Sequence, residues 1–411
     1  MMISSSSSSL STTIVVVIFL IANLYVFADA AELEMPLSGI LGGDIDGVAA
    51  NDNFGSAVAT STDGSRVVVG ARNHDSGKGH VRVFEYGTSA NPTGWSQLGG
   101  DIDGVAQSDN FGSAVAMSSD GNRIVIGAPY RDVLTETEMY PGMEHYSYTY
   151  TNTISDAGSV RVFEYGTSAN LTGWSQLGGD IDGVAQSDNF GSAVAMSSDG
   201  NRIVIGAPYR DVLTETEMYP GMEHYSYTYT NTIYDVGSVR VFEYGTSANL
   251  TGWAQVGGDI DGVVSNSNSM YSGEGFGSAV AMSADGNRIV VGAFSTSYQA
   301  DNTVRVYELG TSANPTNWTM MGSDIKLSGS TDYMYYSSGG NNIGASSDCT
   351  RVVVAFSASS YSSDKMVGMF EYGTTASPSD WSQIGTNMTG EGNEQFGSAV
   401  SMSADGDRVV I

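Results

Sequence analysis

Short apolar runs alternate with short polar turns along the chain, and the same order of runs returns several times. The clearest copy begins with the small-residue run Ser113–Met117, turns through Ser119–Asn122 and continues into the β-branched run Arg123–Ala128. A third run, Ser159–Tyr165, and a fourth, which starts at Trp174, complete the unit. Nearly continuous apolar runs of this length are typical of strands covered on both faces. Each unit therefore predicts four strands, with no helix required.

The unit begins near residues 54, 111, 190, 276, 343 and 396, and no single unit can bury its apolar face alone. Self-similarity of this kind is typical of a modular array. We predict an all-β fold, a β-propeller of four-stranded antiparallel blades with five complete units and a partial sixth. Because the sixth unit stops inside its second strand at Ile411, we expect the chain to be truncated.

The turns decide which parts of a blade lie together. The sequence Ser119-Asp120-Gly121-Asn122 predicts a tight hairpin turn, because glycine accepts a positive φ. Successive connections of an antiparallel meander alternate between the two ends of the sheet. The loops after strands two and four are therefore expected at one end of the blade, and the turns after strands one and three at the other.

Two units carry the letters FG and, one strand later, GAP: Phe111-Gly112 with Gly127-Ala128-Pro129, and Phe190-Gly191 with Gly206-Ala207-Pro208. These letters resemble the FG-GAP repeat of integrin-α-like β-propellers, most closely the tandem-repeat type of secreted and surface proteins of unicellular algae. The resemblance covers nearly all of residues 54–411. It implies a calcium loop between strands one and two, but Ser119–Asn122 is too short to supply six to eight oxygen ligands.

The N-terminal segment differs from the repeats. An apolar run over Ile14–Phe27 is followed by Ala28-Asp29-Ala30, which fits a cleavage site before Ala31. We predict a signal peptide over residues 1–30, a short linker over 31–36 and the propeller over 37–411. An uncleaved anchor is the alternative, although the run is shorter than the ~20 residues of a spanning helix. The protein is expected outside the cell or on the cell surface.

The net charge of −29 comes from 45 acidic and 16 basic residues. Such a surface repels nucleic acid and anionic membranes, so we expect neither as a partner, and no membrane insertion apart from the N-terminal segment. A single cysteine, Cys349, excludes an intrachain disulfide.

Four units carry the sequence Asp-Ile-Asp-Gly after strand four, and its alternate carboxylates resemble half of a calcium loop. Calcium is the one cofactor that this pattern indicates. The simpler interpretation is a turn whose aspartates bond backbone amides. The candidate ligands are Asp44, Asp46, Asp101, Asp103, Asp180, Asp182, Asp259 and Asp261.

Two nearly identical insertions follow strand two of the second and third units, at residues 130–156 and 209–235. Tyrosine-rich loops bind proteins or stack on sugars with little loss of entropy. Packing of the tyrosines on the neighbouring copy is the alternative. The candidate ligand-binding residues are Tyr140, Tyr146, Tyr148, Tyr150, Tyr219, Tyr225, Tyr227 and Tyr229.

Four N-x-T sequences predict glycosylation, and the first three lie in or beside the turn between strands three and four. The acceptor residues are Asn170, Asn249, Asn317 and Asn387. Glycans on that turn would leave the opposite end of the blades open. No grouping of catalytic residues emerges, so we do not expect an enzyme.

The sequence thus favours a secreted or cell-surface recognition protein. It would bind an extracellular protein or glycan through the end that carries the strand 2–3 and 4–1 loops. A structural matrix or cell-wall protein without a discrete ligand is the alternative, followed by an enzyme acting on polysaccharide.

Overall fold

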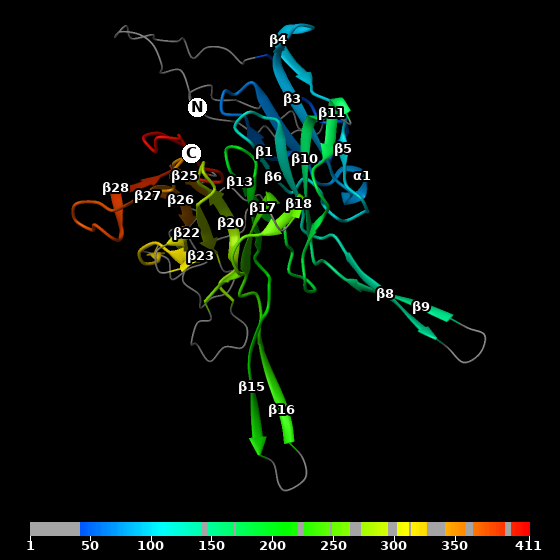
Figure 1. Ribbon diagram of the computed structural model, residues 1–411. Coiled ribbons are helices and arrows are strands. Elements are labelled where there is room, and N and C mark those ends of the chain that lie inside the picture. Colours follow the sequence, from blue (N-terminus) through cyan, green and yellow to red (C-terminus); the bar gives the residue numbers. More distant parts are fainter. Residues whose placement is uncertain are drawn as a thin grey trace.

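The computed structural model describes residues 42–141, 147–167, 170–220, 226–246, 249–263, 273–294, 302–311, 314–326, 342–357, 365–390 and 396–411. Here five four-stranded antiparallel sheets follow one another, each forming one blade of a β-propeller. Figure 1 shows the first strands near the middle of the molecule and the fourth strands toward the outside. The predicted all-β propeller is confirmed.

The blades are built from consecutive strands, with the short helix α1 (His74–Gly77) between the second and third strands of the first blade. The first two blades are β1 (Phe54–Thr60), β2 (Arg66–Ala71), β3 (His80–Thr88), β4 (Asn91–Gln97), and β6 (Ala114–Met117), β7 (Arg123–Ala128), β10 (Ser159–Thr167), β11 (Asn170–Gln176). The next two are β13 (Ala193–Met196), β14 (Arg202–Ala207), β17 (Ser238–Thr246), β18 (Asn249–Gln255), and β20 (Phe276–Met282), β21 (Arg288–Ala293), β22 (Thr303–Thr311), β23 (Asn314–Met320). The fifth blade is β25 (Ile343–Ala345), β26 (Arg351–Ser357), β27 (Lys365–Tyr372), β28 (Trp381–Thr389), and a sixth unit begins with the paired strands β29 (Ser401–Met402) and β30 (Val409–Val410).

Two further kinds of element extend the blades. Each of the first four blades has a two-residue strand that pairs with its third strand. These are β5 (Ile102–Asp103), β12 (Ile181–Asp182), β19 (Ile260–Asp261) and β24 (Ile325–Lys326). The insertions form the hairpins β8 (Val133–Pro141) with β9 (Ser147–Ile154), and β15 (Val212–Pro220) with β16 (Ser226–Ile233), which project away from the blades in Figure 1.

The core lies between the blades, which explains why the second strand is apolar along its whole length. Ile124, Val125 and Ile126 on β7 are all fully buried. Ile124 and Ile126 pack with residues of the first blade, whereas Val125 packs with residues of the third. Since successive side chains of a strand point to opposite faces, a strand between two neighbours buries both sets.

The FG and GAP letters meet across the boundary between two blades. A Cβ atom added to Gly127 would lie 2.0 Å from the carbonyl oxygen of Gly191 in the next blade, and Gly206 stands in the same relation to Gly277. Gly191 itself has a φ of +93°, which favours glycine. The paired glycines therefore allow two backbones to approach closely. The FG and GAP residues recur because neighbouring blades pack together at these positions.

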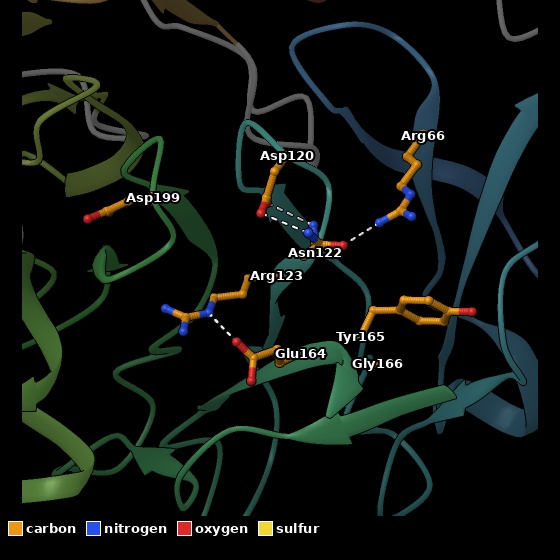
Figure 2. A pocket seen from close by; sticks show the side chains of 8 residues that line it. All are labelled: Arg66, Asp120, Asn122, Arg123, Glu164, Tyr165, Gly166 and Asp199. Carbon is orange, nitrogen blue, oxygen red and sulfur yellow. Dashed lines mark hydrogen bonds and ion pairs between the residues drawn. The ribbon is translucent and has the colours of Figure 1, made fainter. Parts of the chain in front are cut away.

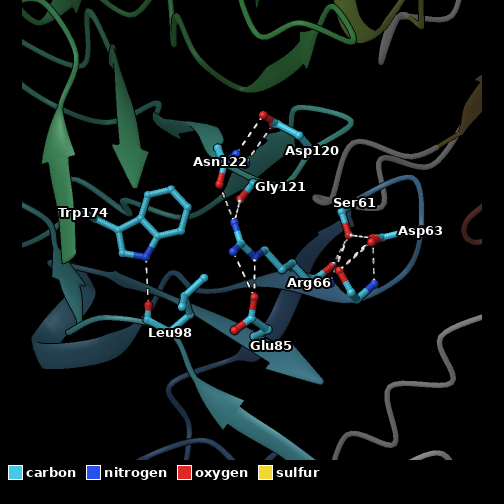
Figure 3. Close-up of polar contacts among 10 residues, drawn as sticks. Ser61, Asp63, Arg66, Glu85, Leu98, Asp120, Gly121, Asn122 and Trp174 are labelled. Carbon is cyan, nitrogen blue, oxygen red and sulfur yellow. Dashed lines mark hydrogen bonds and ion pairs between the residues drawn. The ribbon is translucent and has the colours of Figure 1, made fainter. Parts of the chain in front are cut away.

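Polar side chains join neighbouring blades at the turn between strands one and two (Figure 3). Arg66 forms an ion pair with Glu85 of its own blade and donates to the carbonyl oxygen of Gly121 in the next. Arg123 repeats this arrangement with Glu164 and Gly200. The same junctions carry a tryptophan contact on the outer strands.

The turn itself is held by an aspartate in place of a calcium loop. The Asp120 carboxylate accepts hydrogen bonds from Ser118 Oγ at 2.6 Å and from the backbone nitrogen of Asn122 at 3.0 Å. Partial burial would raise the pKa of Asp120, but these hydrogen bonds outweigh it and lower the pKa. This aspartate therefore serves the turn.

Candidate functional site

The strand register locates the candidate residues at one end of the second blade. Ser159, the first residue of β10, lies opposite both Ala128 at the end of β7 and Asp182 in β12. The hairpin β8–β9 connects β7 to β10 at this same end. The insertions and the Asp-Ile-Asp-Gly segments thus share one end of the blade, which we call the hairpin end.

The Asp-Ile-Asp-Gly segments contribute strands as well as turns. Ile102, Ile181 and Ile260 are at most 9% exposed, and each lies in the short strand beside the third strand of its blade. Burial of this isoleucine explains why the segment pairs where the sequence predicted a loop. The second aspartate of each segment (Asp103, Asp182 or Asp261), in contrast, is exposed or half-buried.

The first aspartate of each of these segments has a partner in the protein. The Asp101 carboxylate accepts from Arg82 at 2.8 and 2.9 Å, and this contact lowers the pKa of Asp101. Asp180 pairs with Arg131 at 2.7 Å, and Asp259 pairs with Arg210 at 3.4 Å. Guanidinium groups of arginines thus compensate the charges of these three aspartates.

The calcium prediction for the eight aspartates of these segments remains a prediction. Asp44 and Asp46 are exposed. In the described ranges, no group of three or more histidine, cysteine, aspartate or glutamate side chains is arranged to hold a metal ion.

The predicted tyrosines lie on the projecting hairpins. Tyr140 faces Tyr148 in the register of β8 and β9, and Tyr219 faces Tyr227 in that of β15 and β16. Tyr150 and Tyr229 face Glu138 and Glu217 in the same two hairpins. Tyr146 and Tyr225 lie outside the described residues, as does the predicted signal peptide.

Three of the predicted acceptor asparagines lie away from the hairpin end. Asn170 and Asn249 begin the fourth strands, where they face Thr167 and Thr246 across the turn. Asn317 Oδ1 accepts from the backbone nitrogen of Gly258 at 3.0 Å, so this side chain also joins two blades. Asn387 belongs to β28, and the register of that strand brings its end beside Met366, at the start of the third strand.

A tyrosine-lined groove at the base of the second hairpin was missed from the sequence. It has a volume of about 550 Å³ and lies where the second and third blades meet. Its lining residues are Tyr130, Gln186, Ser187, Asn189, Tyr209, Asp211, Tyr234 and Asp235. Tyr130 and Tyr234 are 44% and 49% exposed, so their rings are open to a ligand. Four separate segments build the groove, and only Tyr234, which replaces Ser155 of the preceding copy, was indicated by the sequence.

Backbone hydrogen bonds hold the floor of the groove. Ser187 donates its backbone N–H to Ser155 at 3.0 Å, and Asn189 donates to Asp156 at 3.1 Å. The backbone nitrogen of Asp235 donates to Asp211 Oδ1 at 3.1 Å. Removal from water, and then the charge of Asp211, raise the pKa of Asp235.

A second groove, of about 600 Å³, lies at the opposite end, around Arg66, Arg123, Glu164 and Tyr165 (Figure 2). Its charged groups are bonded to one another: Arg123 pairs with Glu164 at 2.8 Å, and Arg66 and Asp120 both bond Asn122. This groove is part of the contact between blades.

Comparison with known proteins agrees with this geometry. Residues 103–138 and 182–217 each match the family model described as FG-GAP repeat. The chain carries FG-GAP repeats. Each match runs from the short fifth strand of one blade, through the first two strands of the next, into the hairpin of the FG-GAP propeller. A comparison with curated proteins finds no match.

Two solved structures are similar at low identity. A candidate 6-phosphogluconolactonase from Bacteroides uniformis is 11% identical, with a TM-score of 0.39 over 81% of this chain and 85% of that one. The periplasmic gluconolactonase PpgL of Pseudomonas aeruginosa is 12% identical, with a TM-score of 0.42 over 82% and 88%. Likeness at this level carries no argument about activity. Among the described residues, no helix has the length and apolarity to cross a membrane.

Proposed function

We propose that this FG-GAP propeller is a secreted or cell-surface recognition protein that binds a glycan or protein ligand, without catalysis, at its hairpin end. The observation that carries the proposal is the tyrosine-lined groove at the base of the second hairpin. FG-GAP repeats are typical of extracellular and cell-surface proteins, which supports the location.

The chemistry of the groove supports recognition. Tyr130 and Tyr234 each present a half-exposed aromatic ring, which offers apolar contact area and a hydroxyl at low entropic cost. Gln186 and Ser187, both exposed, add amide and hydroxyl donors and acceptors, which suit the hydroxyl groups of a sugar. The net charge of −29 disfavours nucleic acid and polyanionic ligands.

The direct test is a binding screen against immobilised glycans and extracellular proteins. Three variants separate the contributions: both hairpins replaced by short turns, Tyr130→Ala with Tyr234→Ala, and Leu171→Ala as a control. Leu171 is 75% exposed at the opposite end. We expect the first two variants to lose binding while the control keeps it. A wild-type protein that retains no ligand in the screen would favour the structural matrix role instead.

One observation favours a second function, glycoside cleavage. Asp235 has a raised pKa and lies beside Asp211, and glycosidases use two carboxyl groups of which one is held protonated. Incubation with cell-wall polysaccharides, followed by an assay for new reducing ends, separates the two. Product formation that disappears in Asp235→Asn would replace recognition by catalysis.

A further inference from the structure

The groove joins two nearly identical units, and its tyrosine lining differs from the residues at the preceding junction. Across residues 111–184 and 190–263 the copies differ at Ser155/Tyr234, Ala157/Val236, Ser175/Ala254 and Leu177/Val256. The first of these differences lies in the groove. At the junction between the first and second blades, the positions of Tyr130 and Tyr234 are held by Asn73 and Ser155. Three tyrosines therefore converge between the second and third blades, compared with one at the preceding junction.

The acidic groups of the groove lack basic partners. No described lysine or arginine forms an ion pair with Asp211 or Asp235. The neighbouring Arg210 is engaged elsewhere, because it pairs with Asp188 at 3.5 Å and Asp259 at 3.4 Å. Partial burial raises the pKa of Asp235 most, and the like charge of Asp211 raises it further. The groove consequently has aromatic walls and a negative charge that a bound cation would neutralise.

We propose that this groove binds a protonated amino sugar, with one face of the sugar ring on Tyr234 and the ammonium group at Asp211 and Asp235. This inference rests on the proposed function and names its ligand class. An uncharged sugar would leave the two carboxylates uncompensated, and a uronic or sulfated sugar would be repelled. An ammonium group that lies close to an aromatic face also gains from the quadrupole of that face.

A polyol is favoured over a basic peptide by the remaining lining. Gln186 and Ser187 line the groove beside the acids, and their exposed side chains can exchange hydrogen bonds with several hydroxyl groups. A lysine side chain would neutralise the charge but has no sugar ring to lie on Tyr234 and no hydroxyl groups. The basic peptide is therefore the alternative that the experiment must separate.

The test is calorimetric titration of the full chain with three probes at about pH 6 and low salt. The probes are an oligomer of glucosamine, the N-acetylated oligomer of the same length, and an oligolysine peptide. We expect the glucosamine oligomer to bind at least about tenfold more tightly than either other probe. Acetylation keeps the ring and removes the cation, so this pair isolates the charge.

Two substitutions locate the binding. Tyr234→Ser restores the residue of the preceding copy and is expected to weaken glucosamine binding about tenfold. Asp235→Asn is expected to weaken it by a similar factor while leaving the melting temperature unchanged or raised, because it removes a charge repulsion. A loss of binding through misfolding would instead lower the melting temperature. Leu171→Ala, an exposed residue at the opposite end of the blade, is the control and should leave the affinity unchanged.

Several results would overturn the inference. Equal affinity for the acetylated oligomer would show that the ammonium group is not recognised, although the proposed recognition function would stand. Stronger binding of oligolysine would assign the groove to a basic peptide. Glucosamine binding that survives both substitutions would place the ligand elsewhere. Failure of the glycan and protein screen as a whole would remove the recognition function together with this ligand.

Discussion

The blade junctions and the tyrosine-lined groove are built from the same repeats, but they use their side chains differently. In the junctions, each arginine after the first turn pairs with a glutamate of its own blade and with the turn of the next blade, from Arg66 through Arg351. In the groove, no arginine of the described part of the chain pairs with Asp211 or Asp235, and the rings of Tyr130 and Tyr234 remain exposed. The difference separates residues that assemble the blades from residues left available to a ligand.

The two regions also differ in how much their residues vary between copies of the repeat. Contacts that recur at every junction are constrained on both sides, because each blade must fit two neighbours. The groove lies at the rim of one junction, where Ser155 can become Tyr234 without disturbing the packing beneath it. A repeat can therefore keep the residues that pack against its neighbours while one copy changes at the rim.

The largest effect is expected from the paired glycines. Gly127→Ala would place a Cβ atom 2.0 Å from the backbone of Gly191, which only a shift of the whole blade can relieve. We expect a loss of about 3 kcal/mol or more in the free energy of unfolding, measured by urea denaturation. Gly179→Ala is the matched control, since nothing lies within 4 Å of its added Cβ. Equal stability of the two variants would disprove the close approach of the blades.

A smaller effect is expected from the arginine contact. Arg123→Ala removes the ion pair with Glu164 and the hydrogen bond to Gly200 of the next blade. Because the side chain is 19% exposed, solvent screens part of the interaction, and we expect a loss of about 1–2 kcal/mol. The measurement is urea denaturation at low and high salt. A stability that does not change would mean that the contact contributes nothing to the junction.

A single hydrogen bond between blades can be tested at the tryptophan contact. Trp174 Nε1 donates to the carbonyl oxygen of Leu98 in the preceding blade at 2.8 Å. Trp174→Phe keeps most of the aromatic packing and leaves that carbonyl without its donor, so a loss of about 1 kcal/mol is expected. Thermal unfolding of this variant beside Leu171→Ala, an exposed control, measures it. An unchanged melting temperature would contradict the predicted contribution of this bond.

The weakest expected effect is a pH dependence confined to the first blade. His80 is fully buried, and neither ring nitrogen has a hydrogen-bond partner in the described part of the chain, whereas the second blade has Ser159 at this position. Burial, then the neighbouring His74 and Arg82, lower the pKa of His80 from 6.5, and Asp101 and Asp103 oppose this. The unfolded chain therefore takes up a proton first.

Stability is consequently expected to fall as the pH drops below 6.5 and to level off below the lowered pKa of folded His80. His80→Ser should flatten the curve of unfolding free energy against pH over this interval. The slope of the wild type is the control. Identical curves would show that another group causes the dependence.

Much of the fold could be predicted from the sequence, because the residues that make the junction contacts recur from one copy to the next. The apolar second strand, the Asp-Gly turn at Asp120 and the glycine pairs are local patterns that recur. The partners of Asp101 and Asp180 could not be read from spacing, since Arg82 and Arg131 reach them only after the strands pair.

The groove was beyond sequence reasoning for a related reason. Tyr130, Asn189 and Tyr234 come from three segments that meet only when two blades lie side by side. Composition drew attention to the tyrosine-rich hairpins instead, and their role in binding remains a prediction. A non-repeating residue among repeats, such as Tyr234, was the one available indication.

The most direct test of the distinction between groove residues and junction residues is a paired measurement on two variants, Tyr234→Ser and Trp174→Phe. Unfolding free energy and affinity for the glucosamine oligomer are measured for both. We predict that Tyr234→Ser keeps the stability within about 0.5 kcal/mol and loses about tenfold in affinity. Trp174→Phe is predicted to lose about 1 kcal/mol of stability and to keep its affinity. If either substitution lowered stability and affinity together, the groove and the junctions would form one unit, and the account would be wrong.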